Sequence, residues 1–236
     1  MPAVPETAAQ IRYARIAGFV YLLLIVLFMG GQFLIGHVTG SGTFTERTAH
    51  IVAALPLYRS ALVVQFLASV LTVLLAYSLY VALKSVDEHI ARLALYFRLG
   101  EAFGGLTSFV TFAALTLRTE PKFAQALGAA QIKALVDLAH AADFASFNIG
   151  IVFFSFGSTL FYRLFLRTAY LPRALSAFGM FASALTFVVA IASLVMPAWG
   201  NALQVGWIPI FIAEIATGIL LMVRGARLAQ TVAIAG

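Results

Sequence analysis

Residues 174–213 read ALSAFGMFASALTFVVAIASLVMPAWGNALQVGWIPIFIA, and this stretch contains no charged residue. It is about twice as long as the run of roughly 20 apolar residues that crosses a bilayer as one helix. Pro197 lies near its middle, within the segment PAWGN, whose composition favours a turn. The stretch therefore predicts two membrane-spanning helices joined by this turn, over about residues 174–196 and 204–225.

The rest of the chain has the composition of a membrane protein as well. Of its 236 residues, 62% are hydrophobic and 10% are charged, whereas a soluble domain carries about 25% charged residues. The charges cluster between apolar runs and do not follow helix faces. Because the chain has no cysteine, it has no disulfide, no thiolate metal site and no cysteine nucleophile.

Four further apolar runs precede residue 174. We expect them to form helices over about residues 14–36, 58–83, 92–117 and 134–165. Between the first two runs, Thr43 and Glu46 have the spacing of a helix capping box, which predicts a short interfacial helix. The sequence thus predicts one domain over residues 1–236, an all-α, polytopic transmembrane helix bundle of about six spans.

Basic residues at the span ends indicate the orientation of the bundle. The larger group lies at the ends that carry the two termini: Arg12, Arg15, Lys84, Arg92, Arg163, Arg167, Arg173, Arg224 and Arg227. A smaller group lies at the opposite ends: Arg47, Arg59, Arg118, Lys122 and Lys133. This bias predicts that both termini are cytoplasmic. Because these basic residues lie at the span ends, we interpret the net charge of +6 as an adaptation to the lipid bilayer. We therefore expect no nucleic-acid partner.

Small and polar residues predict which helix faces pack together. Helices in a bilayer associate through close backbone approach and hydrogen bonds, because lipid tails are as apolar as leucine. The clearest stripe runs along the fifth predicted span in steps of three and four residues: Ser176, Gly179, Ser183, Thr186, Ala190 and Ser193. We expect this face to point into the bundle.

Ionisable side chains at membrane depth cost at least a few kcal/mol, so each needs a partner or a function. Counting about 1.5 Å per residue from Arg92 and from Arg224 places Glu101 and Glu214 near the middle of the bilayer. Arg98 precedes Glu101 by three positions and can pair with it on one helix face. Two interpretations stay open. In the first, Arg98 and Glu101 form a structural ion pair. In the second, Arg98 bridges both carboxylates and the group serves as a ligand site or a proton site.

Asp137, His140 and Asp143 are spaced by three in the outer half of the fourth predicted span. A histidine between two carboxylates can shuttle protons or contribute metal ligands. A catalytic zinc site needs three protein ligands, and the other histidines lie in connections, so we expect no metal. No cofactor motif or nucleophile elbow is present, and we expect neither a cofactor nor a catalytic residue. The candidate buried polar, ligand-binding cluster is Arg98, Glu101, His140, Asp143 and Glu214.

Several short motifs, spread over nearly the whole chain, are shared with a known group of proteins. They are Arg15-Ile16-Ala17-Gly18, Phe97-Arg98-Leu99-Gly100-Glu101-Ala102, His140 before Gly150-Ile151-Val152-Phe153-Phe154, Leu171-Pro172-Arg173, and Glu214 ahead of Arg224-Gly225. In these motifs the chain resembles the bacterial multi-pass membrane family with the domain of unknown function 4386. The resemblance implies a small protein of the bacterial cytoplasmic (inner) membrane, with deep Arg, Glu and His residues at these positions and no agreed activity.

Two kinds of function fit these observations. The first, which we favour, is a non-enzymatic module whose polar cluster holds a lipid-like or small ligand, or which docks to a larger membrane complex or a second copy. The second is a membrane-embedded enzyme or proton-coupled small-molecule transporter that uses the same five residues around a wet cavity. Direct proton coupling requires Glu101, His140 and Glu214 to lie within about two hydrogen-bond lengths of one another or to be joined by water.

Overall fold

The computed structural model describes residues 8–104 and 108–225. Its longer helices are α1 (Ala8–Thr39), α3 (Leu55–Leu83), α4 (Glu88–Gly104), α5 (Ser108–Thr119), α7 (Ala129–Leu166), α8 (Arg173–Val195) and α10 (Ile208–Arg224). Its short elements are α2 (Phe44–Ala53), α6 (Pro121–Ala126), η2 (Pro197–Trp199), α9 (Gly200–Leu203) and η3 (Gln204–Trp207). Arg227 and the middle of the predicted span 92–117 lie outside the described residues.

Six segments of the described chain are long and apolar enough to cross a membrane. Helices α1, α3, α7 and α8 supply one each, and the other two are Glu88–Thr119, which includes α4 and α5, and Gln204–Arg224. This confirms the predicted all-α, polytopic bundle. The predicted turn is confirmed too, because α8 ends at Val195 and only short elements separate it from α10.

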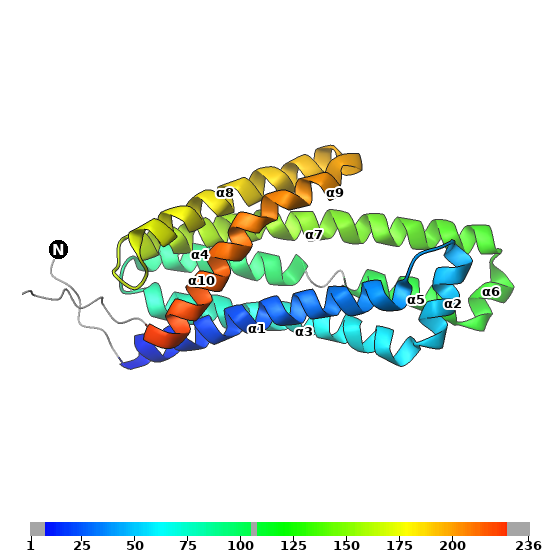
Figure 1. The fold of residues 1–236 in the computed structure, drawn as a ribbon, viewed down its shortest axis with the longest axis horizontal. Helices are drawn as coiled ribbons and strands as arrows, with labels where there is room; N and C mark the ends of the chain where they lie inside the picture. Colours follow the sequence, from blue (N-terminus) through cyan, green and yellow to red (C-terminus); the bar gives the residue numbers. More distant parts are fainter. Residues whose placement is uncertain (1–7, 105–107, 226–236) are drawn as a thin grey trace, which may run out of the picture.

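The longer helices run along one common direction, apart from α10, which crosses the others diagonally (Figure 1). It begins next to α8 and ends on α1. The start of α1, the end of α10, and the α3–α4 and α7–α8 connections lie at one end of the bundle, which we call the termini end (Figure 1). Helices α2, α5 and α6 lie at the opposite end, called the α2–α6 end (Figure 1).

The predicted capping box starts α2. Oγ1 of Thr43 accepts a hydrogen bond from the backbone N–H of Glu46 at 3.3 Å, and the Thr43 backbone N–H donates to Glu46 Oε2 at 2.7 Å. These bonds satisfy backbone donors that a helix start otherwise leaves open. The Thr43 backbone N–H also holds the pKa of Glu46 below its usual value.

The crossing of α10 over α1 depends on two glycines. A Cβ atom added to Gly18 would lie 2.6 Å from the carbonyl oxygen of Gly218, whereas one added to Gly30 on the same helix would meet nothing within 4 Å. The backbones can therefore touch only where both side chains are absent. Since Glu214 lies one helical turn before Gly218, this contact fixes where its carboxylate enters the bundle.

The predicted packing face of α8 is confirmed. All six residues of the stripe are buried. The hydroxyls of Ser183 and Thr186 donate to carbonyl oxygens of their own helix, at 2.7 Å and 2.8 Å, so they need no partner across the seam. A Cβ atom on Gly179 would lie 2.5 Å from Cδ1 of Tyr162, so the absence of a side chain there makes room for that ring.

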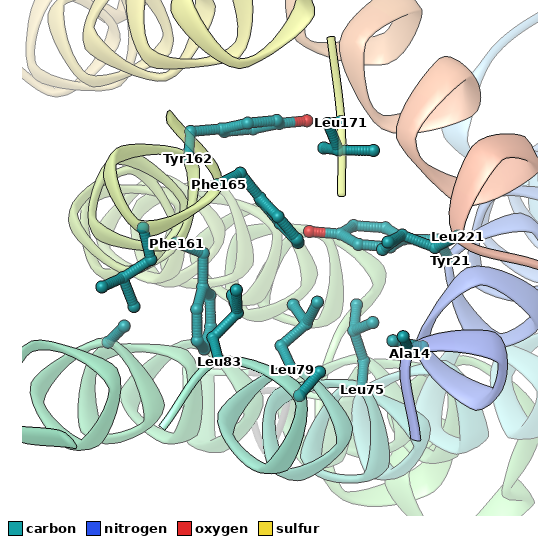
Figure 2. Close-up of a cluster of buried hydrophobic side chains, with 14 of the residues drawn as sticks. Ala14, Tyr21, Leu75, Leu79, Leu83, Phe161, Tyr162, Phe165, Leu171 and Leu221 are labelled. Carbon is teal, nitrogen blue, oxygen red and sulfur yellow. The ribbon is translucent and has the colours of Figure 1, made fainter. Parts of the chain in front are cut away.

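A closely packed apolar core closes the termini end (Figure 2). Side chains from α1, α3, α7 and α10 converge there with one from the α7–α8 connection: Ala14, Tyr21, Leu75, Leu79, Leu83, Phe161, Tyr162, Phe165, Leu171 and Leu221. Two members of this core, Tyr21 and Tyr162, carry hydroxyl groups toward the candidate site described next.

Candidate functional site

Arg98 is the centre of a buried polar cluster. It is 2% exposed, and its Nη1 atom lies 3.0 Å from Oε2 of Glu101, so the expected pairing within α4 is present. Nη1 also donates to Oγ of Ser158 on α7 at 3.3 Å. The guanidinium carbon stands 4.7 Å from the ring centroid of Phe154, a cation–π contact that suits a desolvated arginine.

Glu214 approaches the same guanidinium from α10. Arg98 interacts electrostatically with Glu101 and with Glu214, so carboxylates from two helices act on one cation, and of these two Glu101 is the one within ion-pair distance. Oε1 of Glu214 is buried and has no hydrogen-bond partner within the described chain, whereas Oε2 of Glu101, also buried, is held by the ion pair with Arg98. If both carboxylates are ionised, the cluster therefore carries one excess negative charge.

Glu214 lies at a depth that makes this charge costly. It precedes Arg224, at the end of α10, by ten positions, or about 15 Å measured along this diagonal helix. Half of a typical hydrocarbon core is about 15 Å, so Glu214 lies well inside the span. A carboxylate at this depth requires compensation from the protein or from a bound group.

Tyr21 and Tyr162 complete the cluster. Both are buried, and the hydroxyl of Tyr162 lies 3.1 Å from Oγ1 of Thr217. Tyr21 interacts electrostatically with Glu214 and Tyr162. We did not predict these residues, because a tyrosine in an apolar helix is usually core. The sequence contains one sign of further polar groups near Glu214. Thr217, the partner of Tyr162, follows Glu214 by three positions, which places the threonine hydroxyl one turn from the carboxylate.

His140 and Asp143 lie away from this cluster. Gly150 is the part of α7 that faces Glu101, since a Cβ atom on it would lie 3.8 Å from the Glu101 carbonyl oxygen. His140 precedes Gly150 by ten positions, about 15 Å of helix, and Asp143 precedes it by seven, about 10 Å. The structure thus brings Arg98 together with Glu101 and the α10 carboxylate, and it places the other two candidates toward the α2–α6 end.

His140 and Asp143 belong to a second polar group at that end. Oδ1 of Asp143 accepts a hydrogen bond from Thr111 at 3.4 Å. His140 interacts electrostatically with Arg118 and Asp137, while Asp137 forms an ion pair with Lys133 one turn away. In the described ranges, no three His, Asp or Glu side chains are arranged to hold a metal ion.

The separation of the two groups bears on proton transfer. A direct relay needs donor and acceptor within hydrogen-bond reach, or one water apart. The rise of about 15 Å between the levels of His140 and Glu101 along α7 exceeds that reach several times. A three-residue relay through Glu101, His140 and Glu214 is therefore not supported.

Comparison with known proteins gives one match. A family model described as Domain of unknown function (DUF4386) matches residues 16–225. This range contains every residue of the buried cluster. No curated protein and no solved structure matches the chain.

Proposed function

We propose that this chain, which belongs to the DUF4386 family, is a non-enzymatic multi-pass membrane protein whose buried polar cluster binds a small organic cation. The family match confirms the resemblance seen in the short motifs. Because the family is described as one of unknown function, the proposal rests on the geometry of the cluster.

The observation that carries the proposal is the buried Oε1 atom of Glu214, which has no hydrogen-bond partner within the described chain although it lies beside the Arg98–Glu101 ion pair. An ionised carboxylate accepts hydrogen bonds and donates none, so its missing partner must be a donor. When both carboxylates are ionised, one guanidinium opposes two negative charges, so that partner should also bring positive charge. A primary ammonium group supplies both, with three donors and one charge.

The surroundings of the carboxylates suit an ammonium with an apolar body. Phe154 and the buried rings of Tyr21 and Tyr162 border the cluster, and aromatic faces attract cations. The core around them is apolar, which favours an alkyl chain over a hydrated ion. An alkylammonium amphiphile therefore fits, whereas a carboxylate or phosphate ligand would add to the negative charge already present.

Ligand binding can be tested in lipid nanodiscs with three probes of equal chain length: n-octylammonium, n-octanol and n-octanoate. We expect only n-octylammonium to raise the thermal unfolding midpoint, in a saturable manner. Binding to the folded state stabilises it by about 2.7 kcal/mol when the free ligand is a hundred times its Kd. Protection by octanoate or octanol to the same extent would contradict the proposal.

Two variants make this test specific to the cluster. Glu214→Gln keeps the shape of the side chain but removes its charge, so the response to n-octylammonium should be lost. Glu120→Gln removes a charge at the start of α6, outside the cluster, and should keep the response. If Glu214→Gln still responds to n-octylammonium, the ligand binds outside the cluster and the proposal is overturned. If the stability of the wild type depends on pH through this carboxylate and never on ammonium, the site takes a proton only, which also overturns the proposal.

A further inference from the structure

Three aromatic rings stack across the bundle on the α2–α6 side of the polar cluster. The rings of Phe28 on α1 and Phe147 on α7 have centroids 6.0 Å apart and lie within 8° of parallel. The Phe147 ring stacks in turn on Trp207, at the end of η3, at 5.3 Å and again 8°. We call these three side chains the aromatic stack. It joins three elements that are far apart in the sequence.

The register of the helices places this stack directly over the cluster. Each ring is seven positions from a residue of the cluster or one that borders it: Phe28 from Tyr21, Phe147 from Phe154, and Trp207 from Glu214. Seven residues make about two helical turns, so on α1 and on α7 the two residues share a face and are separated by about 10.5 Å along the helix. Trp207 directly precedes α10, the helix that carries Glu214. Since α1 runs opposite to α7 and α10 (Figure 1), all three displacements point toward the α2–α6 end.

The two sides of the cluster are closed to different degrees. On the termini side, Phe161 and Phe165 are each 1% exposed in a continuous core (Figure 2). On the other side, Phe147 is 37% exposed, and Phe28 and Trp207 are half-buried. Separating one stacked pair costs about 0.5–1.5 kcal/mol in addition to the free energy of exposing its apolar surface. Opening a packed core loses many van der Waals contacts at once. The easier route to the cluster passes the stack.

Trp207 belongs to a segment of short helical elements and not to a long helix. It ends a series of short elements, η2, α9 and η3, between α8 and α10. Such 3₁₀ turns have weaker hydrogen-bond geometry than α-helix and often mark hinges. Next to it, a Cβ atom on Gly206 would lie 2.6 Å from Cγ2 of Val189, so η3 is seated closely on α8.

We propose that the aromatic stack of Phe28, Phe147 and Trp207 is the gate through which a ligand reaches the polar cluster from the α2–α6 side. This proposal rests on the proposed function, because the gate would be the route by which the organic cation reaches the carboxylates. A tryptophan face is the best aromatic partner for a cation, so the gate would favour the same ligand class as the carboxylates. Displacing Trp207 would open the route, and restacking it would close the site.

The gate can be tested by measuring how fast a water-soluble carbodiimide modifies Glu101 and Glu214 in nanodiscs, with peptide mass spectrometry as the readout. Both membrane faces are accessible in a nanodisc, so the orientation of the chain does not matter. We expect Trp207→Ala to raise the modification rate about two- to tenfold, the range that corresponds to losing one stacking contact. Trp199→Ala, at an exposed ring outside the stack, should leave the rate unchanged.

Two milder variants keep the test decisive if Trp207→Ala does not fold. Trp207→Phe retains a ring and should keep the slow rate, while Phe28→Leu removes a ring but fills the space and should raise it. Rates equal to wild type in folded Trp207→Ala or Phe28→Leu would overturn the gate. The n-octylammonium response is measured separately, so a failed gate with intact binding is distinguishable from a failed binding site.

Discussion

Replacing Arg98 with methionine tests how much the buried cluster depends on its cation. Methionine keeps an unbranched stem against Gly157, where the arginine side chain now lies, but it removes the only positive charge that opposes Glu101 and Glu214 in the described cluster. Breaking a buried ion pair from one side costs about 3–5 kcal/mol. Glu101 keeps 20% of its side chain accessible, so we expect the lower end, about 3 kcal/mol.

The assay is equilibrium unfolding in mixed micelles, with the free energy of unfolding compared between variants. Arg98→Lys keeps the charge and should lose less than Arg98→Met. Adding Glu101→Gln to Arg98→Met removes one uncompensated carboxylate, so the double variant should recover at least about 1 kcal/mol, because neighbouring sites are not additive. If Arg98→Met is within about 0.5 kcal/mol of wild type, or if the second substitution destabilises further, the electrostatic reasoning is refuted.

Three other predictions concern the framework around the site. Gly18→Val should lower the free energy of unfolding by about 1–3 kcal/mol through overpacking against α10. Gly30→Val should stay near wild type in the same assay, because a Cβ atom at Gly30 meets no atom within 4 Å. Tyr162→Phe should cost about 0.6–1.5 kcal/mol for the lost hydrogen bond, and no additional loss should appear when Thr217→Val is combined with it. Asp87 should stabilise the fold at neutral pH, because the backbone N–H of Ile90 and then Arg167 hold its pKa below the usual value. That stability is present above the unfolded pKa of about 3.9 and disappears as pH falls through the lower folded value, so thermal melts of Asp87→Asn and wild type should differ at pH 7 and converge below about pH 3.

The sequence was sufficient to predict the membrane spans and the packing face of α8. Apolar length defines a membrane span almost independently of context, because the bilayer sets one thickness for all of them. The stripe along α8 was predictable for a similar reason, since small residues are the main way for helices to approach in lipid. The capping box of α2 is local chemistry and needs no tertiary information.

The cluster was only partly predictable. Pairing of Arg98 with Glu101 follows from a spacing of three on one helix. His140 and Asp143 were expected in the outer half of their span, and the sequence did not show how far that half lies from Arg98. With 38 residues, α7 is about 57 Å long, well beyond the hydrocarbon core. Its polar residues are therefore spread over two separate groups. The hydroxyl of Tyr162 escaped notice because only the tertiary fold brings it to α10.

The most direct test of the account is an experimental structure of the protein in lipid nanodiscs with n-octylammonium. The account predicts the ammonium nitrogen within about 2.7–3.2 Å of carboxylate oxygens of both Glu101 and Glu214, with the alkyl chain among apolar side chains. A ligand bound elsewhere, or a Glu214 carboxylate that faces bulk water or acyl chains, would contradict it.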